Sequence, residues 1–306
     1  MKNKTLFGNI LLMITALIWG CAFVAQSAGM DYVKPITFNG IRCIIAGIVL
    51  IPAVFIFDTI KKKNGTYKKM TPGDKKTLLI GGVCCGLAVF AATTIQQYGI
   101  AQTTVGKAGF ISVLYVLIVP FFGLVFKRKP PKLIWFCSFL AIAGLYFLCM
   151  NESLSINQGD FVVFIGAICY AIHIMVVDHF APKTDCVKLS CLQFLVAGTI
   201  SFFAMLIVDK PSLSSILDAW LPLLYAGALS GGLGYTLQII GQKWTEPSIA
   251  SIIMSLESVF AVIAGAVLLS QIPTAREIFG CVLMFAAIVI IQISENPKNK
   301  ITEVEA

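Results

Sequence analysis

Charge is scarce in this sequence. Charged residues make up 12% of the 306 positions, about half the share of a typical soluble domain, which is about 25%. Hydrophobic residues make up 58%, and the mean hydropathy is +0.89. This composition excludes an ordinary soluble domain and predicts an all-α protein that crosses a membrane several times.

Histidine and the common catalytic motifs are also scarce. The chain has only His173 and His179, and it lacks an HExxH pair, a Gly-x-Ser-x-Gly turn and a Gly-rich loop ending in Lys-Ser/Thr. These absences argue against a zinc hydrolase, a serine hydrolase and an ATP-driven pump. We therefore predict no enzyme activity and no cofactor.

The ten cysteines do not indicate a metal site. Most lie inside apolar runs, where a thiol behaves as a small hydrophobic group. Cys186 and Cys191 are five residues apart, but no histidine pair accompanies them at metal-ligand spacing. The sequence predicts no bound metal.

Long apolar runs divide the chain into ten predicted membrane spans. We place them at Gly8–Ala28, Thr37–Phe57, Thr77–Gly99, Val105–Phe126, Lys132–Met150, Asp160–Asp178, Leu189–Val208, Asp218–Gly241, Ser248–Leu269 and Ala275–Ser294. A signal-peptide interpretation of the first run is weaker, because nine further spans follow it.

The net charge of +8 follows from lysines in short loops, which sets membrane orientation rather than indicating nucleic-acid binding. If the N-terminus is cytoplasmic, the cytoplasmic segments hold 18 of the 23 Lys and Arg residues and the outer loops hold four. This asymmetry predicts a multi-pass cell-membrane protein with both termini in the cytoplasm.

The stretch from Ser248 to Pro273 has a single ionisable side chain, Glu257, near its centre. At helical spacing its large aliphatic residues form one stripe, and its small residues lie on other faces beside the glutamate. Large residues suit lipid, whereas small ones let a neighbouring helix approach. We expect one continuous helix with Glu257 facing protein or a cavity and with its aliphatic stripe facing lipid: Ile252, Leu256, Val259 and Ile263.

The same stretch occurs twice. A shift of 142 residues places Gly106–Pro131 on Ser248–Pro273 and Tyr115 on Glu257, and a shift of 151 aligns the earlier spans, with Trp19 on Tyr170. We predict two five-helix repeats, residues 1–150 and 151–306. Because five is odd, the second repeat enters the membrane from the opposite side, an arrangement that places a binding site between the halves at mid-membrane.

Three motifs resemble those of a known family. Ala16–Gln26, ALIWGCAFVAQ, resembles the first-helix Trp-Gly motif of the EamA family of the drug/metabolite transporter superfamily. Ser255–Gly265, SLESVFAVIAG, resembles the ninth-helix motif, with its first-half copy at Ile111–Gly123. The resemblance implies ten spans in two repeats and transport of amino acids, other metabolites or drugs.

Ionisable groups within spans are costly and usually functional. Glu257 is the leading candidate for coupling or solute binding, and Arg42 is the second, close enough in predicted depth for a salt bridge between the halves. His173 is a candidate proton relay, with a neutral hydrogen-bonded core histidine as the alternative. The other candidates could line a cavity, pack in the core or bond helices together: Trp19, Gln26, Gln96, Tyr115, Tyr170, Gln193, Tyr235, Gln238 and Ser255.

Together these features predict a secondary active transporter that exports a small organic solute across the inner membrane by alternating access. Its expected partners are the solute, the lipid bilayer and protons as a candidate coupling ion, with no nucleic acid, in a monomer or a homodimer. An integral membrane enzyme and a channel are the alternatives. Saturable exchange without large conductance would separate a carrier from a channel.

Overall fold

In the computed structural model, residues 2–103, 105–127, 130–149, 158–269 and 273–294 are described. Within these ranges the regular structure is entirely helical. Eight helical segments are long and apolar enough to cross a membrane, and Lys132–Phe147 is a shorter apolar helix. The predicted boundary between the repeats, at residues 150 and 151, lies outside these ranges.

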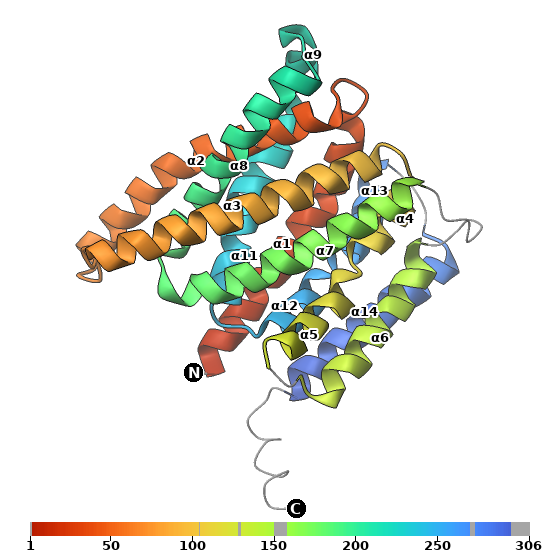
Figure 1. Cartoon of the computed structure of the whole chain (residues 1–306). Coiled ribbons are helices and arrows are strands. Elements are labelled where there is room, and N and C mark those ends of the chain that lie inside the picture. The colour runs from red at the N-terminus through yellow and green to blue at the C-terminus, as the bar shows by residue number, and fades with distance from the viewer. Residues whose placement is uncertain (1, 104, 128–129, 150–157, 270–272, 295–306) are drawn as a thin grey trace, which may run out of the picture.

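The helices follow one another in a bundle (Figure 1). Their bounds are α1 (Lys2–Gly29), α2 (Pro35–Lys63), α3 (Pro72–Ile100), α4 (Val105–Ser112), α5 (Tyr115–Val125), α6 (Lys132–Cys149), α7 (Gln158–Phe180), η1 (Ala181–Lys183), α8 (Cys186–Val208), α9 (Leu213–Asp218), α10 (Trp220–Leu224), η2 (Tyr225–Gly234), α11 (Tyr235–Gln242), α12 (Pro247–Met254), α13 (Glu257–Leu269) and α14 (Ala275–Ser294).

Three predicted spans are interrupted rather than continuous. The fourth breaks between α4 and α5, and the ninth, expected as one helix over Ser248–Leu269, breaks between α12 and α13. The Ser255 hydroxyl donates to the Ile252 carbonyl at 2.6 Å just before Glu257, and such back-bonding competes with the regular helix. The break makes Glu257 the first residue of α13.

The eighth span contains a ten-residue π-helix, η2. π-helices are rare and usually a single turn, and they occur often at functional sites. Four of the ten residues are glycines, which are weak α-helix formers. At its end the Tyr235 N–H donates to the Ser230 carbonyl, five residues back.

Helices α2 and α8 are antiparallel neighbours joined at both ends. At one end the Thr37 backbone N–H donates to Asp209 at 2.7 Å. At the other end Lys61 forms an ion pair with Asp185, and Lys188 pairs with Asp58 at 2.8 Å. The pairing therefore extends over the length of both helices.

Between those ends, α2 and α8 approach through glycines. A Cβ atom on Gly47 would lie 3.1 Å from Leu195, and a Cβ atom on Gly198 would lie 3.3 Å from the backbone of Cys43 and Ile44. Gly47 of α2 lies against α8, and Gly198 of α8 lies against α2, so the contact is reciprocal.

The largest apolar core surrounds α12 and α13, and it overturns one expectation. Ile252, Leu256 and Val259 are fully buried, whereas we expected their stripe to face lipid; only Ile263, at 46% exposure, is open. The reason is position: α12 and α13 contact α1, α5, α6 and α14, so both the small and the large faces meet protein.

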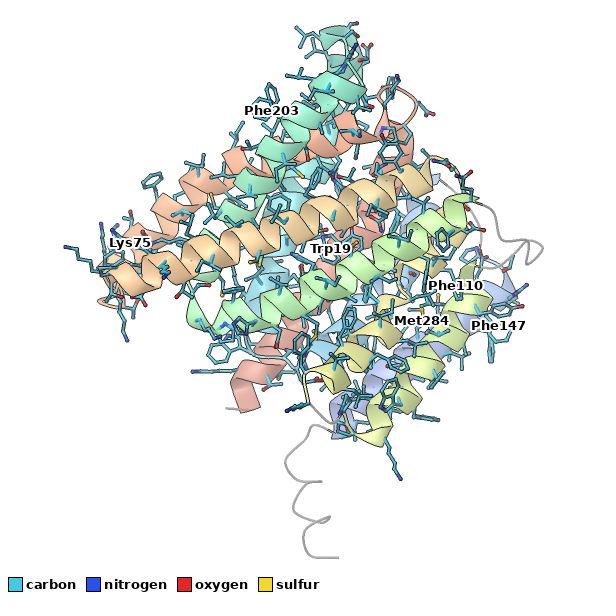
Figure 2. All side chains as sticks on the ribbon, viewed as in Figure 1. Trp19, Lys75, Phe110, Phe147, Phe203 and Met284 are labelled. Carbon is cyan, nitrogen blue, oxygen red and sulfur yellow. The ribbon has the colours of Figure 1, made fainter. Side chains whose placement is uncertain are left out.

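The outer surface is apolar instead. Phe203 on α8 points away from the bundle, whereas Trp19 lies near its centre (Figure 2). Phe203, Ile207 and Val267 are at least 60% exposed. Large exposed apolar side chains on long helices fit a surface covered by lipid.

Candidate functional site

A narrow cavity lies where the two halves of the chain meet. The volume in which the centre of a water molecule can lie is about 40 Å³. One water needs roughly 10–15 Å³ of such volume. The lining of the cavity comes from α1, α2, α3 and α5 of the first half and from α7, α8, η2, α11 and α13 of the second. The lining residues are Trp19, Ala22, Phe23, Gln26, Arg42, Thr93, Gln96, Tyr115, Tyr170, Phe194, Ala226, Ser230, Gly231, Tyr235 and Glu257.

Trp19 and Tyr235 form an aromatic wall. Their ring centroids are 4.6 Å apart, and the Trp19 indole N–H donates to the Ser230 carbonyl at 3.3 Å. Gly234 makes room for the indole, because a Cβ atom there would lie 2.7 Å from Trp19 Nε1. The π-helix thus helps to orient Trp19.

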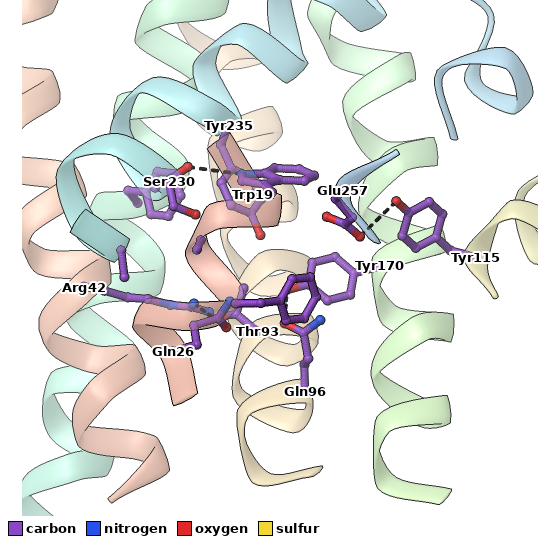
Figure 3. Close-up of a pocket in the computed structure, with 15 residues that line it drawn as sticks. Trp19, Gln26, Arg42, Thr93, Gln96, Tyr115, Tyr170, Ser230, Tyr235 and Glu257 are labelled. Carbon is purple, nitrogen blue, oxygen red and sulfur yellow. Dashed lines mark hydrogen bonds between the residues drawn. The ribbon is translucent and has the colours of Figure 1, made fainter. Parts of the chain in front are cut away.

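Glu257 and Tyr115 form a second wall (Figure 3). Tyr115 Oη donates to Glu257 Oε1 at 3.3 Å, and both side chains are buried. As the first residue of α13, Glu257 lies at the positive end of the helix dipole, which favours a carboxylate.

Gly20 sets how closely α1 approaches Glu257. A Cβ atom at Gly20 would lie 2.6 Å from both the Glu257 carbonyl oxygen and the Phe260 Cβ atom. The backbones of α1 and α13 can meet at this distance only because residue 20 has no side chain.

Arg42 lies at the opposite end of the cavity from Glu257 (Figure 3). Its Nη1 donates to Gln26 Oε1 at 3.0 Å, and its Nε donates to Asn39 Oδ1 at 2.9 Å. No salt bridge joins Arg42 to Glu257 among the described residues, so this structure does not form the pair that their predicted depths allowed. Arg42 Nη2 is buried without a protein partner, which leaves a charged N–H group able to bind a solute.

Gln96 links the cavity walls made by α3 and α7. Its carbonyl accepts from Tyr170 Oη at 2.9 Å, and its amide N–H donates to Ser112 Oγ at 3.0 Å. Both hydrogen bonds fix the amide in place, and Tyr170 lies beside the cavity with it.

Eight of the twelve candidates from the sequence line this cavity, and four are buried outside its lining. His173 Nε2 is 3.1 Å from Gln193 Oε1, and both side chains are fully buried. Ser255 is tied to its own helix, and Gln238 is buried outside the lining. His173 also meets the Tyr235 ring edge-on, with centroids 5.8 Å apart, so it supports the wall rather than forming it.

Seven lining residues were not among the candidates. Ser230 and Gly231 had a signal in the sequence, because they lie in a glycine-rich run, Tyr225–Gly234. The other five resemble ordinary core residues in the sequence: Thr93 and the apolar residues Ala22, Phe23, Phe194 and Ala226.

Comparison with known proteins identifies the family. The sequence model of the EamA-like transporter family matches residues 6–150 and again residues 157–293. The chain therefore belongs to the EamA-like transporter family, and its class is that of membrane transporters.

Individual relatives match this chain over most of both lengths. An uncharacterized transporter of Archaeoglobus fulgidus is 28% identical over 95% of this chain and 87% of its own. The uncharacterized transporter YoaV of Bacillus subtilis is 23% identical over 90% and 94%, and protein PagO of Salmonella typhimurium is 23% identical over 83% and 82%. A solved crystal structure, 15% identical, has the same fold with a TM-score of 0.73, covering 94% of this chain and 98% of that one.

Proposed function

We propose that this protein is a secondary active carrier that exports a small organic solute across the cell membrane by alternating access. The observation that carries the proposal is the buried cavity whose walls come from both halves of the chain. A cavity between helices that is lined mainly by apolar and aromatic side chains, with a few polar groups, is the usual form of a small-molecule site. Inverted repeats place such a site between them.

The proposal includes ten spans in two inverted repeats, 1–150 and 151–306. The reciprocal contact between α2 and α8 supports it, because Ile44 and Leu195, like Gly47 and Gly198, are 151 positions apart. Two-fold relations produce such paired contacts. The antiparallel course of α2 and α8, the pairing of α6 with α14, and the two consecutive family matches support it as well.

The width of the cavity favours a carrier over a channel. About 40 Å³ holds a few waters but not an organic solute. A solute can enter only after the helices around the cavity separate, and a carrier cycle supplies that separation. An open channel would need a continuous pathway through the bundle.

The charges in the cavity indicate the chemistry of the solute. Arg42 offers a free N–H group at one end, and Glu257 lies at the other. The Trp19 and Tyr235 rings lie between with apolar faces. This arrangement suits a small solute that carries an anionic group, a cationic or hydrogen-bond-donating group, or both.

Protons are the proposed coupling ion, with Glu257 as the coupling group. It is buried in the cavity beside a tyrosine hydroxyl, and carboxyl groups within membranes commonly relay protons. A carboxyl group that faces each side of the membrane in turn can exchange a proton as the cavity changes sides.

The test uses the purified protein in liposomes with an imposed pH gradient and a panel of labelled amino acids and related metabolites. A carrier should show saturable exchange and accumulation that follows the pH gradient, with no large conductance in planar bilayers. Ohmic current without saturation would favour a channel, and chemical conversion of the solute would favour an enzyme. Vesicles of the two orientations report the direction of transport.

A further inference from the structure

A second cavity lies at the end of the bundle where the α2–α3 loop meets the α7–α8 connection. It measures about 380 Å³ and is lined by six lysines and three aspartates, together with Thr66, Tyr67, Met70, Leu78 and Thr184. The charged residues are Asp58, Lys61, Lys68, Lys69, Asp74, Lys183, Asp185, Lys188 and Lys243. It shares no lining residue with the central cavity.

The acidic residues of this cavity are already engaged. Asp185 pairs with Lys61, and Asp58 pairs with Lys188. Asp74 accepts from the Thr71 hydroxyl and backbone at the start of α3. The remaining lysines have no acidic partner among the described residues: Lys68, Lys69, Lys183 and Lys243. The cavity therefore has an excess of positive charge.

An apolar groove begins beside this cavity. It measures about 670 Å³ and lies between α3, α5 and α7, with Cys84, Phe122, Ile172 and His179 among its walls. Lys183 of the basic cavity donates to His179 of the groove, with 2.8 Å between Nζ and Nε2. The two sites are thus linked by a direct contact, and α3 contributes to the walls of both.

We propose that the basic cavity and the adjoining groove together bind one anionic phospholipid, with the phosphate among Lys68, Lys69 and Lys183 and an acyl chain along Ile172 and Phe122. Basic pockets between helices at a membrane surface bind anionic head groups. A soluble anion would occupy only the basic cavity and leave the 670 Å³ groove empty. A phospholipid has a charged head group for the basic cavity and an apolar chain for the groove beside it.

The first experiment measures lipid binding to the intact purified protein by native mass spectrometry and thermal shift. Phosphatidylglycerol should bind and stabilise, and phosphatidylcholine should not. Inorganic phosphate and glycerol 3-phosphate, which lack acyl chains, should give no shift. The proposal would be overturned if the two phospholipids bound and stabilised the protein equally. It would also be overturned if inorganic phosphate alone raised the melting temperature as much as phosphatidylglycerol does.

The second experiment locates the site. Replacing Lys68, Lys69 and Lys183 together with glutamine should weaken phosphatidylglycerol binding by about fivefold per lysine, on the order of 100-fold in all. The matched control replaces Lys34 and Lys210, which lie outside both cavities. An equal loss in the control would reduce the effect to general surface charge and refute a site.

The third experiment tests the groove. Ile172→Trp fills it from a side chain that is 43% exposed, and Phe203→Trp alters an exposed position on α8 as the control. The Ile172 variant should lose at least tenfold in phosphatidylglycerol affinity while the control binds as before. Unchanged phosphatidylglycerol affinity in the Ile172 variant would show that no acyl chain lies in the groove, and this would refute the proposal.

Discussion

Tyr115 donates a hydrogen bond to Glu257 although the two residues are 142 positions apart. That separation equals the shift of 142 residues that places Gly106–Pro131 on Ser248–Pro273 in the sequence. Positions that correspond in the predicted repeat therefore touch each other in the cavity. Such contacts arise where corresponding elements meet at a two-fold axis.

Glu257→Gln tests whether this carboxyl group couples protons to solute. The amide keeps the size of the side chain and accepts from Tyr115 but cannot exchange a proton. In liposomes, proton-driven accumulation should fall to the equilibrium level, while exchange at equal concentrations persists. Tyr115→Phe is the control, since it removes the hydrogen bond and keeps the carboxyl group; it should retain coupling. Accumulation that survives Glu257→Gln would assign coupling elsewhere.

Arg42 should act with Gln26 and not with Glu257. In a double-mutant cycle on thermal stability, Arg42→Gln and Glu257→Gln should add to within about 0.5 kcal/mol, because the two side chains are not in contact. Arg42→Gln combined with Gln26→Leu should deviate from additivity by about 0.5 kcal/mol or more. The reverse pattern of couplings would revive a salt bridge between the halves.

Arg42 should also set affinity for the solute. Removing its charge in Arg42→Gln should raise the solute KM at least tenfold, because the free Nη2 group is lost. Arg42→Lys should recover only part of this affinity, since lysine lacks the planar fork of donors. Equal affinity in all three proteins would show that the solute does not contact residue 42.

Gly20→Ala should destabilise the protein by about 1–3 kcal/mol, the usual cost of overpacking. The new Cβ atom would overlap the α13 backbone at Glu257 and Phe260. Gly232→Ala is the control, because the nearest atom to its added Cβ would lie 3.6 Å away. Thermal unfolding of both variants measures the difference; comparable melting temperatures would mean that α1 and α13 can separate freely.

Asp185 gives the protein a pH-dependent contact between its halves. Burial tends to raise the pKa of this carboxyl group, but the Lys61 hydrogen bond, the Lys188 backbone N–H and both lysine charges outweigh it and lower the pKa. A carboxylate with a lowered pKa stabilises the fold above its unfolded pKa of about 3.9, and the contribution is lost as pH falls through the folded value.

Asp185→Asn should therefore destabilise the protein at pH 7, by about 1–2 kcal/mol, because asparagine still caps α8 but cannot pair with Lys61. The gap to wild type should shrink as pH falls below about 4. Asp218→Asn, at an exposed position, is the control and should leave stability unchanged. A gap that stays constant down to pH 3 would contradict an ionic role.

The predicted orientation of the chain rests on its basic loops and can be tested directly. Reporter fusions after Lys63 and Lys183 should report the cytoplasm, and fusions after Lys34 and Pro211 should report the outside. A mixed pattern would contradict the inverted arrangement.

Sequence patterns located the helices well because long apolar runs are unambiguous, but they did not reveal where those helices break. The turn before Glu257 depends on a hydroxyl-to-carbonyl bond at Ser255, and the π-helix depends on local glycine content. Neither leaves a periodic signal. Periodicity also separated the faces of residues 248–269, yet it could not tell that this segment lies at the centre of the bundle, where Leu256 meets protein.

The candidate site was only partly predictable for a similar reason. The few ionisable groups within the spans pointed to Glu257 and Arg42, and the aromatic residues of the spans included Trp19; all three line the cavity. The predicted depths in the membrane allowed a salt bridge between Arg42 and Glu257, but depth does not fix lateral position. The actual partners of Arg42 are Asn39, three residues earlier on the same helix, and Gln26, 16 residues away on the preceding helix.

The joined ends of α2 and α8 limit how the molecule can move. Thr37–Asp209 at one end and Lys61–Asp185 at the other hold this pair of helices together at both ends. A tilt of either helix would have to carry the other with it across the membrane. In the proposed carrier cycle, the displacement that widens the central cavity then falls to α1, η2 and α13. Helix α1 contacts both of the others, and it meets α13 at Gly20, without an ion pair among the described residues.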